Sequence, residues 1–440
     1  MPAIEVSAIE RATMRKVYWR LLPFGCLCMI VCYLDRINVG FAALTMRGDL
    51  GLSATAFGFG AGLFYAGYCA FEIPSNIALM KLGARFWIAR IMVTWGLLSM
   101  AMAFVWNTNS FIVLRFLLGA AEAGFFPGML LYFTFWFPAA HRGRMVAWFG
   151  VATPVAVALG GPISSFLMLL DGTWGLAGWK WLFIGEGVPA VILGIVCLAY
   201  LVDGPHNAVW LTQEEKDWLA AEMERERRAV TAAHGHISMW QALVNPKVWA
   251  LGIIYLGIVT PSVGLVLFAP QIIRQAGLSN FATGFVTSIP YIAGVVGMIL
   301  WGHFSDRVNE RRWNLFAGCM VSGVALIFAG WTVGTMVAVA AMCAATVGFY
   351  GSKGPFWALP NTILSGTAAA AGLAFINSLG NLGGWFGPTI VGWMADRTGG
   401  FQGGLYAIAG FCALAAIVTI LGVAAPRRTE QTGAVGAPAE

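Results

Sequence analysis

Seven ionisable residues stand inside long apolar stretches of the sequence, where little water is present to solvate a charge. They are Asp35, Arg36, Glu72, Arg115, Glu122, Glu186 and Lys353. A charge at the centre of a bilayer costs about 2.5–3.5 kcal/mol on insertion scales, so each needs a partner, a water-filled cavity or a function. A carboxylate in such a setting can bind and release protons, and an arginine or lysine can bind an anion.

The composition predicts that these apolar stretches are transmembrane helices. Of the 440 residues, 59% are hydrophobic and 10% are charged, and the mean hydropathy is +0.76. A soluble domain has about 25% charged residues, and a disordered chain has low hydrophobicity, so both classes are excluded. At about 20 residues for each helix, the chain has room for roughly twelve spans.

Apolar runs bounded by charge, glycine or proline give the expected spans. These are 19–42, 54–78, 86–106, 109–135, 145–170 and 179–201, then 247–270, 282–303, 312–332, 336–360, 368–393 and 402–425. We therefore expect an all-α integral membrane protein with two six-helix bundles in pseudo-two-fold symmetry around a central cavity. The expected divisions are an N-terminal tail 1–18, a bundle 19–201, a loop with an amphipathic helix 202–245, a bundle 246–425 and a C-terminal tail 426–440.

Lysine and arginine in the loops set the orientation, because they concentrate on the cytoplasmic side of a membrane. With the N-terminus inside, nineteen of the 26 Lys and Arg residues fall in cytoplasmic segments, four outside and three within spans. This bias predicts a multi-pass protein of the cell inner membrane with both termini in the cytoplasm. The first span has no small-residue cleavage site before it, so we expect it to remain in place.

Other classes of function lack the residues that they need. The eight cysteines lie in apolar stretches, and Cys26-x-Cys28 has no second pair beside it, so neither a metal nor a cofactor is expected. Nucleic-acid binding would need a basic face or stripe, and none is present. An embedded enzyme would need a catalytic group at a membrane boundary, and a channel would usually show repeated pore motifs. We therefore expect a transporter, most simply a monomer, and not an enzyme.

Two loops half a chain apart correspond to each other. Basic residues follow the second and the eighth spans at matching offsets, which suggests a duplicated transporter with loops that take part in conformational change. The residues concerned are Lys81, Arg85, Gly302, Asp306, Arg307 and Arg311.

The second of these loops resembles the signature loop of the major facilitator superfamily. The segments Arg115–Gly124 and Gly160–Pro162 are similar to its fourth-span and fifth-span motifs. Three further motifs, which begin at Tyr33, Glu72 and Gly354, resemble its anion:cation symporter branch, whose members include permeases for tartrate, sugar acids, hydroxyphenylacetate and phthalate. The resemblance covers nearly the whole chain. One departure is that Met80 and Lys81 replace the Asp-Arg pair of the first loop, which argues against an aspartate latch there.

The rise of a helix gives the depth of the charged residues. At about 1.5 Å per residue, Asp35 lies roughly 10 Å below the outer boundary and Arg115 roughly 9 Å, so the two are placed to pair. Glu122 lies about two turns further in, on the same face as Arg115. Asp35 and Arg36 are successive residues about 100° apart around their helix, so they do not point at one partner.

These positions lead to a hypothesis of proton-coupled symport of a small organic anion by alternating access. Arg36 presents a planar fork to a substrate carboxylate, and Asp35 and Glu122 carry protons under the influence of Arg115. The resemblance implies the same roles for these four residues. Two alternatives stay open: buried pairs that only fix helix packing, and an exporter or anion exchanger of the same fold.

Further polar and aromatic residues are candidates for the lining of the site. Asn377 and Asn381 are four residues apart and share a helix face, and we also include Tyr65 and Trp357, although packing explains Trp357 equally well. Lys353 stands among glycines and a proline that should disrupt the helix. It either receives a second anionic group or extends toward the cytoplasm.

Two buried acids receive other roles. Glu72 is assigned to a structural or gating pair and Glu186 to a structural role. The cationic site favours a carboxylate substrate, and nearby aromatic residues favour an aromatic acid or a dicarboxylate over a sugar acid.

Overall fold

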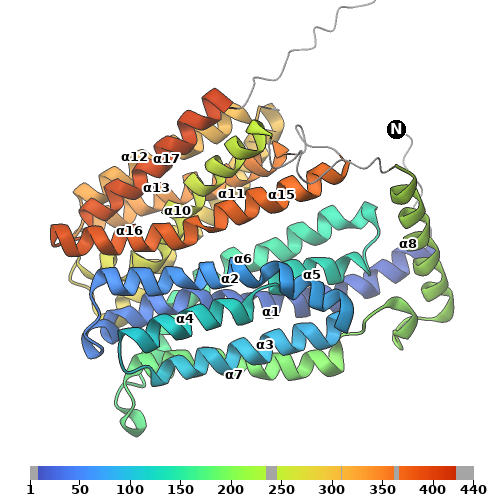
Figure 1. Cartoon of the computed structure of the whole chain (residues 1–440), viewed down its shortest axis with the longest axis horizontal. Coiled ribbons are helices and arrows are strands. Elements are labelled where there is room, and N and C mark those ends of the chain that lie inside the picture. Colours follow the sequence, from blue (N-terminus) through green and yellow to red (C-terminus); the bar gives the residue numbers. More distant parts are fainter. Residues whose placement is uncertain (1–7, 234–244, 309, 361–365, 423–440) are drawn as a thin grey trace, which may run out of the picture.

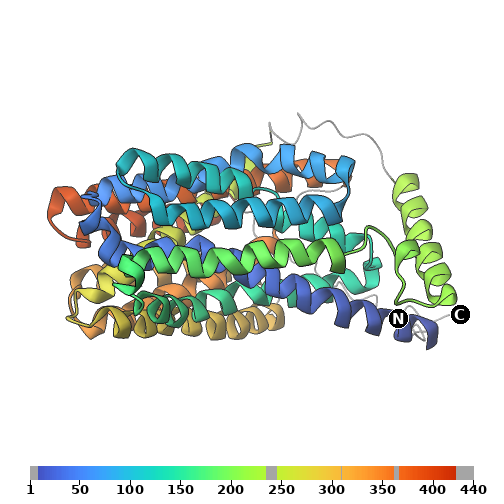
Figure 2. The ribbon, with the colours of Figure 1, turned by 90° about the horizontal axis from the view of Figure 1, so that it is seen from below.

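Two bundles of long helices make up the structure. The computed structural model describes residues 8–233, 245–308, 310–360 and 366–422, and no β-strand occurs among them. The helices of the first half occupy the lower part of Figure 1 and those of the second half the upper part, and Figure 2 shows the same helices from below. Eleven helices among the described residues are long and apolar enough to cross a membrane. The all-α membrane fold predicted from the sequence is confirmed.

The helices of each half follow the predicted order of spans. The first half has α1 (Ala8–Asp49), α2 (Ala54–Leu82), α3 (Ala84–Ala101), α4 (Thr108–Glu122), α5 (Phe125–Thr134), α6 (Ala139–Met168) and α7 (Gly178–Tyr200). Short 3-10 turns occur at Met102–Phe104, Thr173–Gly175 and Pro205–Asn207, and α8 (Gln213–Ala233) follows the first half. The second half has α10 (Pro246–Arg274), α11 (Asn280–Val308), α12 (Arg312–Trp331), α13 (Met336–Ala358), α15 (Gly366–Asn381), α16 (Gly383–Thr398) and α17 (Gln402–Gly422).

Two of the predicted spans are each built from two helices. The fourth is α4 followed by α5, because Ala123 leaves helical geometry and Gly124 adopts a φ of +85°, a left-handed conformation that favours glycine. The eleventh is α15 followed by α16, two helices of 16 residues that meet at Leu382. The first break falls directly after Glu122, so the backbone changes direction at a predicted site residue.

Helix α1 is longer than its predicted span of 19–42. It runs for 42 residues, and its first turns project past the bundle toward α8 in Figure 2. These turns are held by contacts with α8 and α6: Lys16 Nζ lies 2.8 Å from Glu215 of α8, and the Tyr18 hydroxyl donates to the carbonyl of His141 of α6. The predicted tail 1–18 is therefore helical from Ala8 onward.

The two halves meet closely at the end of the molecule where α1 ends, which we call the closed end. Here the Asp396 carboxylate of α16 accepts hydrogen bonds from the first amide groups of α2, at 3.0 Å from Ala54 and 2.7 Å from Thr55. A carboxylate at this position also interacts favourably with the positive end of the α2 dipole. Arg47 at the end of α1 donates to Gln271 of α10 at 2.6 Å.

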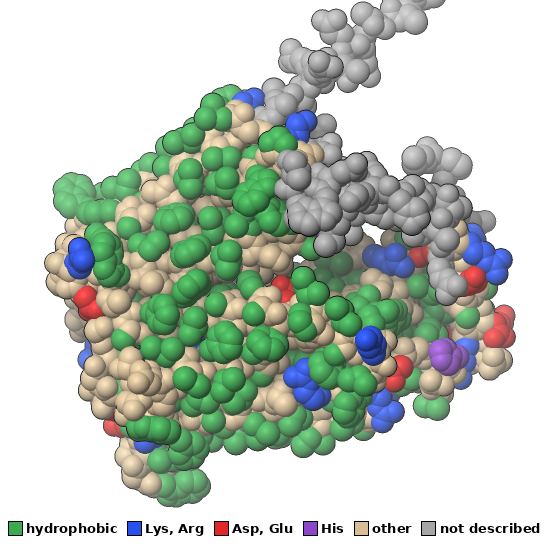
Figure 3. Space-filling view, viewed as in Figure 1, with side chains coloured by type: hydrophobic (Ala, Val, Ile, Leu, Met, Phe, Trp, Pro, Cys, Tyr) green, Lys and Arg blue, Asp and Glu red, His purple; other side chains and the backbone are tan. Residues whose placement is uncertain are grey.

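Small residues allow the halves to approach each other at this end. Gly161 of α6 faces Gly284 of α11, and a Cβ atom added to Gly284 would lie 2.6 Å from the Gly161 carbonyl oxygen. The neighbouring Ser165 hydroxyl donates to the carbonyl of Phe281 across the same contact. At the opposite end, which carries α8, Figure 3 shows the surface hollowed between the two halves. The halves are thus closed at one end and open at the other.

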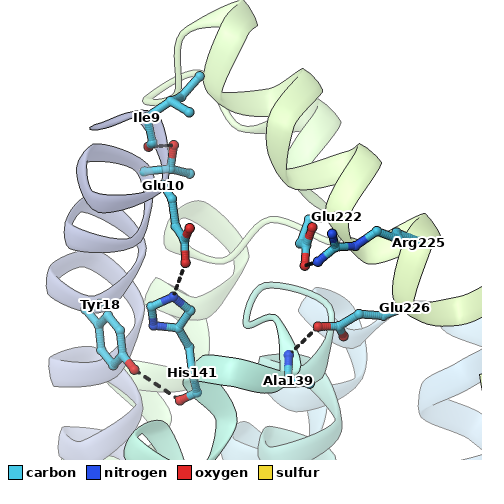
Figure 4. A network of polar contacts seen from close by, with 9 residues as sticks. Ile9, Glu10, Tyr18, Ala139, His141, Glu222, Arg225 and Glu226 are labelled. Atoms are coloured by element: carbon cyan, nitrogen blue, oxygen red, sulfur yellow. Dashed lines mark hydrogen bonds and ion pairs between the residues drawn. The ribbon is translucent and has the colours of Figure 1, made fainter. Parts of the chain in front are cut away.

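Helix α8 is fastened to the first half at the open end, as Figure 4 shows for part of the contact. Glu226 accepts hydrogen bonds from the Ala139 amide at 2.5 Å and from Arg142 at 2.9 Å, so it joins α8 to the start of α6. Glu10 of α1 lies 3.2 Å from His141 of α6. Helix α8 lies within 202–245, the range in which an amphipathic helix was expected.

We expect acid to release the first turn of α8. Burial acts to raise the pKa of Glu215, but hydrogen bonds from Lys16 and Thr212 outweigh it and lower the pKa below its ordinary value. A depressed pKa stabilises the docked state above the ordinary glutamate value near 4.5, and this contribution is lost as the pH falls below that value.

The test is amide hydrogen exchange in α8, compared at pH 7 and pH 4. The protection factor, which corrects for the slower intrinsic exchange in acid, should fall at pH 4. Glu215→Gln should lower the protection factor at pH 7 by an amount equal to about 1 kcal/mol or less, because Lys16 is largely solvated. Glu214→Gln, one residue away and exposed, is the matched control. Equal exchange in the Glu215 and Glu214 variants would show that this ion pair does not hold α8.

Candidate functional site

An ion pair between Arg36 of α1 and Glu122 of α4 forms the centre of the candidate site. Arg36 Nε donates to Glu122 Oε1 at 3.0 Å, and Nη2 donates to the same oxygen. The Glu122 side chain is fully buried and the Arg36 side chain is 12% exposed. The second oxygen of Glu122, Oε2, is buried without a hydrogen-bond partner. The pair therefore holds one oxygen tightly and leaves the arginine partly accessible.

Aromatic rings surround the Arg36 guanidinium. Its Cζ atom lies 4.9 Å from the ring centre of Tyr33, 5.0 Å from that of Tyr68 and 5.3 Å from that of Phe64. Tyr65, a predicted lining residue, lies 5.9 Å away. Such contacts hold a cation without neutralising it, so they orient the arginine and keep its charge available to an anion.

Asp35 points in a different direction from Arg36. Its carboxylate accepts hydrogen bonds from Trp95 Nε1 at 2.9 Å and Ser99 Oγ at 2.6 Å, both on α3, and it lies 3.4 Å from Asn38 Nδ2. Only 1% of Asp35 is exposed. The predicted divergence of Asp35 and Arg36 around their helix agrees with this geometry.

The expected pairing of Asp35 with Arg115 does not occur in this structure. Arg115 is fully buried and donates from Nη2 to the Ala61 carbonyl of α2 at 3.2 Å, while its Nε and Nη1 atoms have no hydrogen-bond partner. The depths of the two residues were estimated from helix rise, which does not say which way a side chain points. Arg115 is therefore a buried arginine with two donor atoms that have no hydrogen-bond partner.

Lys353 occupies an aromatic surface in the second half. Its Nζ atom lies 4.5 Å from the ring centre of Tyr350, one turn earlier on α13, and no ion pair to it occurs among the described residues. The predicted disruption by Gly351, Gly354 and Pro355 is wrong, because α13 is helical through all of them. Pro355 lies in the last turn, where the neighbouring helices support the backbone.

A tyrosine cluster connects the two cationic residues across the halves. Tyr350 packs with Tyr291 of α11 and with Ile37 of α1, and Tyr33 of α1 lies against the same cluster. Tyr33 also contacts Arg36, and Tyr350 contacts Lys353. Arg36 and Lys353, from different halves, therefore border one aromatic region.

The remaining predicted lining residues have less specific surroundings. Trp357 packs on the ring of Tyr255, with ring centres 5.0 Å apart, which is the packing role considered above. Tyr65 lies against Gly384 of α16, so it sits at the contact between the halves. Asn377 and Asn381 are partly buried on the last turns of α15, next to the break before α16.

The predicted gating residues divide into two groups. Lys81 and Arg85 are exposed at the turn between α2 and α3, where the Arg85 amide donates to Asp203 Oδ1 at 2.9 Å. Asp203, which lies after α7, is a contact residue of this loop that could not be assigned from the sequence. Glu72 is partly buried, and no pair to its carboxylate occurs among the described residues, so the expected structural pair is not seen.

The second loop is organised by its own hydrogen bonds. Arg311 Nη1 donates to Ser305 Oγ at 3.0 Å, and Glu310 accepts from the Trp313 amide at 2.7 Å at the start of α12. Arg307 is exposed, Gly302 has open space around its Cα atom, and the Asp306 side chain lies outside the described residues.

Several contact residues of the site could not be assigned from the sequence. Cys32 Sγ lies 3.2 Å from Glu122, and Trp95, Ser99 and Asn38 hold Asp35. The spacing of Cys32 and Arg36, four residues apart on one helix, is the signal that places both beside Glu122. Trp95 and Ser99 are also four residues apart, on α3. Nothing in the sequence marks that face of α3 as the one that meets Asp35.

Two six-span halves that enclose buried ionisable residues and open at one end are the architecture of a membrane transporter. Residues 25–384 match the model of the Major Facilitator Superfamily. The chain belongs to this superfamily, and it is a transport protein and not an enzyme.

Comparison with individual proteins agrees with this family. The chain is 48% identical to a "Putative tartrate transporter" of Agrobacterium vitis, covering 97% of this chain and 95% of the relative. It is 40% identical to a "Quinolone resistance transporter" of Acinetobacter baumannii, covering 90% and 92%. The fold resembles a solved bacterial homologue of the human lysosomal transporter Spinster in an inward-facing conformation, with a TM-score of 0.76, 16% identity and coverage of 91% and 96%.

Proposed function

We propose that this protein is a secondary active transporter that takes up a small organic anion together with protons. The observation that carries the proposal is the Arg36–Glu122 pair, in which a partly exposed guanidinium is held by a fully buried carboxylate. A substrate carboxylate and Glu122 compete for the same arginine. Protonation of Glu122 weakens its bond to Arg36 and frees the guanidinium for the substrate, because a neutral carboxyl is a poorer acceptor. Substrate binding and proton binding then favour each other.

Asp35 and Arg115 extend this coupling in the proposal. Both are buried, and Arg115 has two donors without partners. When the halves move, Arg115 can approach a carboxylate and favour its ionised form, which releases a proton. A cavity closes at least cost when its charges balance, so protonated carboxyls with a bound anion form the state that crosses between the two sides.

The proposed substrate is a carboxylate, with a dicarboxylate favoured. Arg36 and Lys353 border one aromatic region from opposite halves, so a molecule with an anionic group at each end can contact both. Lys353 lacks an acidic partner among the described residues and is available to such a group. Tartrate, named for the relative from Agrobacterium vitis, has two carboxylates and suits this arrangement.

We place the protein in the cell inner membrane as a monomer, with α8 and both chain ends on the cytoplasmic side. The positive-inside rule supports this orientation, because basic residues concentrate at the end that carries α8. The structure then represents an inward-open state, closed on the outer side by Asp396, Gln271 and the contact between Gly161 and Gly284.

Lys353→Met is expected to lower the affinity for dicarboxylates selectively. Removing the ammonium group deletes one charge-assisted contact, so the affinity for tartrate should fall about tenfold or more, while a monocarboxylate should change by less than about threefold. Binding is measured by isothermal titration with the purified variant. Lys247→Met, at the exposed start of α10, is the control. Equal losses for both substrate types would mean that Lys353 does not contact the second group.

Transport in proteoliposomes tests the whole proposal and separates it from an exporter. Labelled tartrate and a panel of aromatic and sugar acids are offered outside vesicles whose outer medium is more acidic than the lumen. Accumulation above the outside concentration, abolished by a protonophore, is the expected result for at least one acid. Accumulation driven only by the opposite gradient would instead identify an exporter. We include this outcome because one relative is named for quinolone resistance. Movement that only exchanges one anion for another would identify an exchanger.

A further inference from the structure

A second buried carboxylate lies beside the proton site, and the proposed function makes no use of it. Glu186 of α7 is 3% exposed, and its Oε1 atom accepts a hydrogen bond from Ser164 Oγ of α6 at 3.1 Å. Its other oxygen, Oε2, is buried and has no hydrogen-bond partner. A fully charged carboxylate with a single donor in such surroundings is strongly disfavoured.

The side chain of Asn38 connects Glu186 with Asp35. Asn38 is one turn after Asp35 on α1 and is itself fully buried. Its Nδ2 atom lies 3.4 Å from Asp35 Oδ1, and the same side chain is a neighbour that acts on the Glu186 carboxyl. The Asn38 Oδ1 atom has no hydrogen-bond partner. Two carboxyls thus share one amide, and the group has an unused acceptor on Asn38.

The charges around this group do not support two ionised carboxyls. Helix α7 packs against α1, α3 and α6. The polar groups of these helices that act on Glu186 are Asp35 and Asn38 of α1 and Ser164 of α6. No lysine or arginine of the described residues forms an ion pair with Glu186. Two negative charges separated by one amide, with no cation between them, would repel each other in a region that water does not reach.

The number of donors decides which of the two carboxyls is neutral. Asp35 accepts hydrogen bonds from Trp95 at 2.9 Å and from Ser99 at 2.6 Å, in addition to its contact with Asn38. Glu186 receives one hydrogen bond, from Ser164, and its other polar neighbour is the Asn38 side chain that it shares with Asp35. Hydrogen bonds to the ionised form favour ionisation, so Asp35 is the carboxyl that ionises more readily and Glu186 is the one that keeps a proton.

We propose that Glu186 is a permanently protonated positioning residue, which orients Asn38 and through it the proton-binding carboxylate of Asp35. Its proton supplies the donor that the Asn38 carbonyl oxygen lacks, and this leaves the Asn38 NH2 group turned toward Asp35. Without that donor the Asn38 side-chain amide can rotate and turn its oxygen toward the Asp35 carboxylate. The two oxygens then repel each other. The proposal rests on the role of Asp35 in the proposed function, and it assigns Glu186 no share in the transported protons.

Two substitutions at Glu186 give opposite expectations. Glutamine has the shape of a protonated glutamate, with an oxygen for Ser164 and an NH2 group for Asn38, so Glu186→Gln should retain proton-driven accumulation and the wild-type pH profile. Glu186→Leu removes the donor and loosens Asn38, so Asp35 loses one hydrogen bond to its charged form. The pH at which transport is half-maximal should then rise by about one unit. Asn38→Leu should give the same shift by a separate route.

Infrared spectroscopy of the purified protein gives a readout that does not depend on transport. The carbonyl band of a protonated carboxyl should be present at pH 8 in the wild type and in Glu214→Gln, and absent or reduced in Glu186→Gln. Loss of proton-driven accumulation in Glu186→Gln with intact tartrate exchange would overturn the proposal, since it would mean that Glu186 ionises during transport. A carbonyl band in Glu186→Gln that is as strong as in the wild type would also overturn the proposal. Failure of the proposed function would instead appear in the wild type, which would not accumulate any acid on a proton gradient.

Discussion

Arg36→Lys is expected to weaken substrate binding about tenfold to a hundredfold. The guanidinium donates from two nitrogen atoms to Glu122 and lies among four aromatic rings, while it still offers donors to a substrate. A lysine ammonium is a point charge without the planar fork, so it cannot bind Glu122 and a substrate carboxylate in the same geometry. A charge-assisted hydrogen bond is worth about 1.5–3 kcal/mol, which sets the expected range.

The measurement is isothermal titration of purified Arg36→Lys with an acid that the wild type transports. Arg228→Lys serves as the control, because it makes the same substitution on the exposed surface of α8, away from the site. Thermal unfolding of both variants shows whether the fold survives. Wild-type affinity in a folded Arg36→Lys protein would mean that the substrate carboxylate binds elsewhere.

Glu122→Gln is expected to separate substrate binding from proton coupling. The amide resembles a protonated carboxyl, so Arg36 is released from a charged competitor and the affinity measured at pH 8 should rise about tenfold or more. Exchange of internal for external substrate should continue, because it needs no net proton movement. Accumulation driven by a proton gradient should fall to the level seen with a protonophore.

Proteoliposome assays of exchange and of accumulation, made with the same preparation, check this prediction. Glu214→Gln, an exposed neutralisation on α8, should leave both activities at wild-type levels. Full accumulation by Glu122→Gln would remove this residue from the proton pathway. Loss of exchange together with accumulation would show that the ionised carboxylate is needed to hold the site together.

The helices and the depth of the charged residues follow from the sequence because they depend on local patterns. Apolar length sets the spans, and the period of a helix separates Asp35 from Arg36 around α1. The break between α4 and α5 could not be located in this way. It depends on Ala123 and Gly124, which form a turn that the apolar pattern of 109–135 does not interrupt.

The direction of each side chain depends on tertiary packing, which spacing alone does not contain. Helix rise predicts similar depths for Asp35 and Arg115, but Asp35 faces α3 and Arg115 faces α2, so the expected pair is replaced by separate contacts. Tertiary packing also decides the backbone around Lys353. The glycines and the proline beside Lys353 suggested an unwound backbone, whereas close packing of α13 against α11 and α12 keeps the helix continuous.

Residues that partner across long stretches of sequence were the hardest to foresee. Asp203 caps the turn after α2 from a position more than a hundred residues away, and Asp396 caps α2 at the closed end from the other half of the molecule. Neither acid lies in a sequence pattern that indicates a capping role. That role depends on which helix N-terminus packs against the carboxylate, and this is decided by the tertiary structure.

Proton uptake on substrate binding tests the central claim most directly. Purified wild-type protein in a weakly buffered solution at about pH 7.5–8 is mixed with saturating substrate. A pH-sensitive dye records the change in pH. Competition between Glu122 and the substrate for Arg36 requires that binding draws protons from the solution, and that Glu122→Gln draws fewer. Binding of the same substrate with no proton uptake by the wild type would contradict the account.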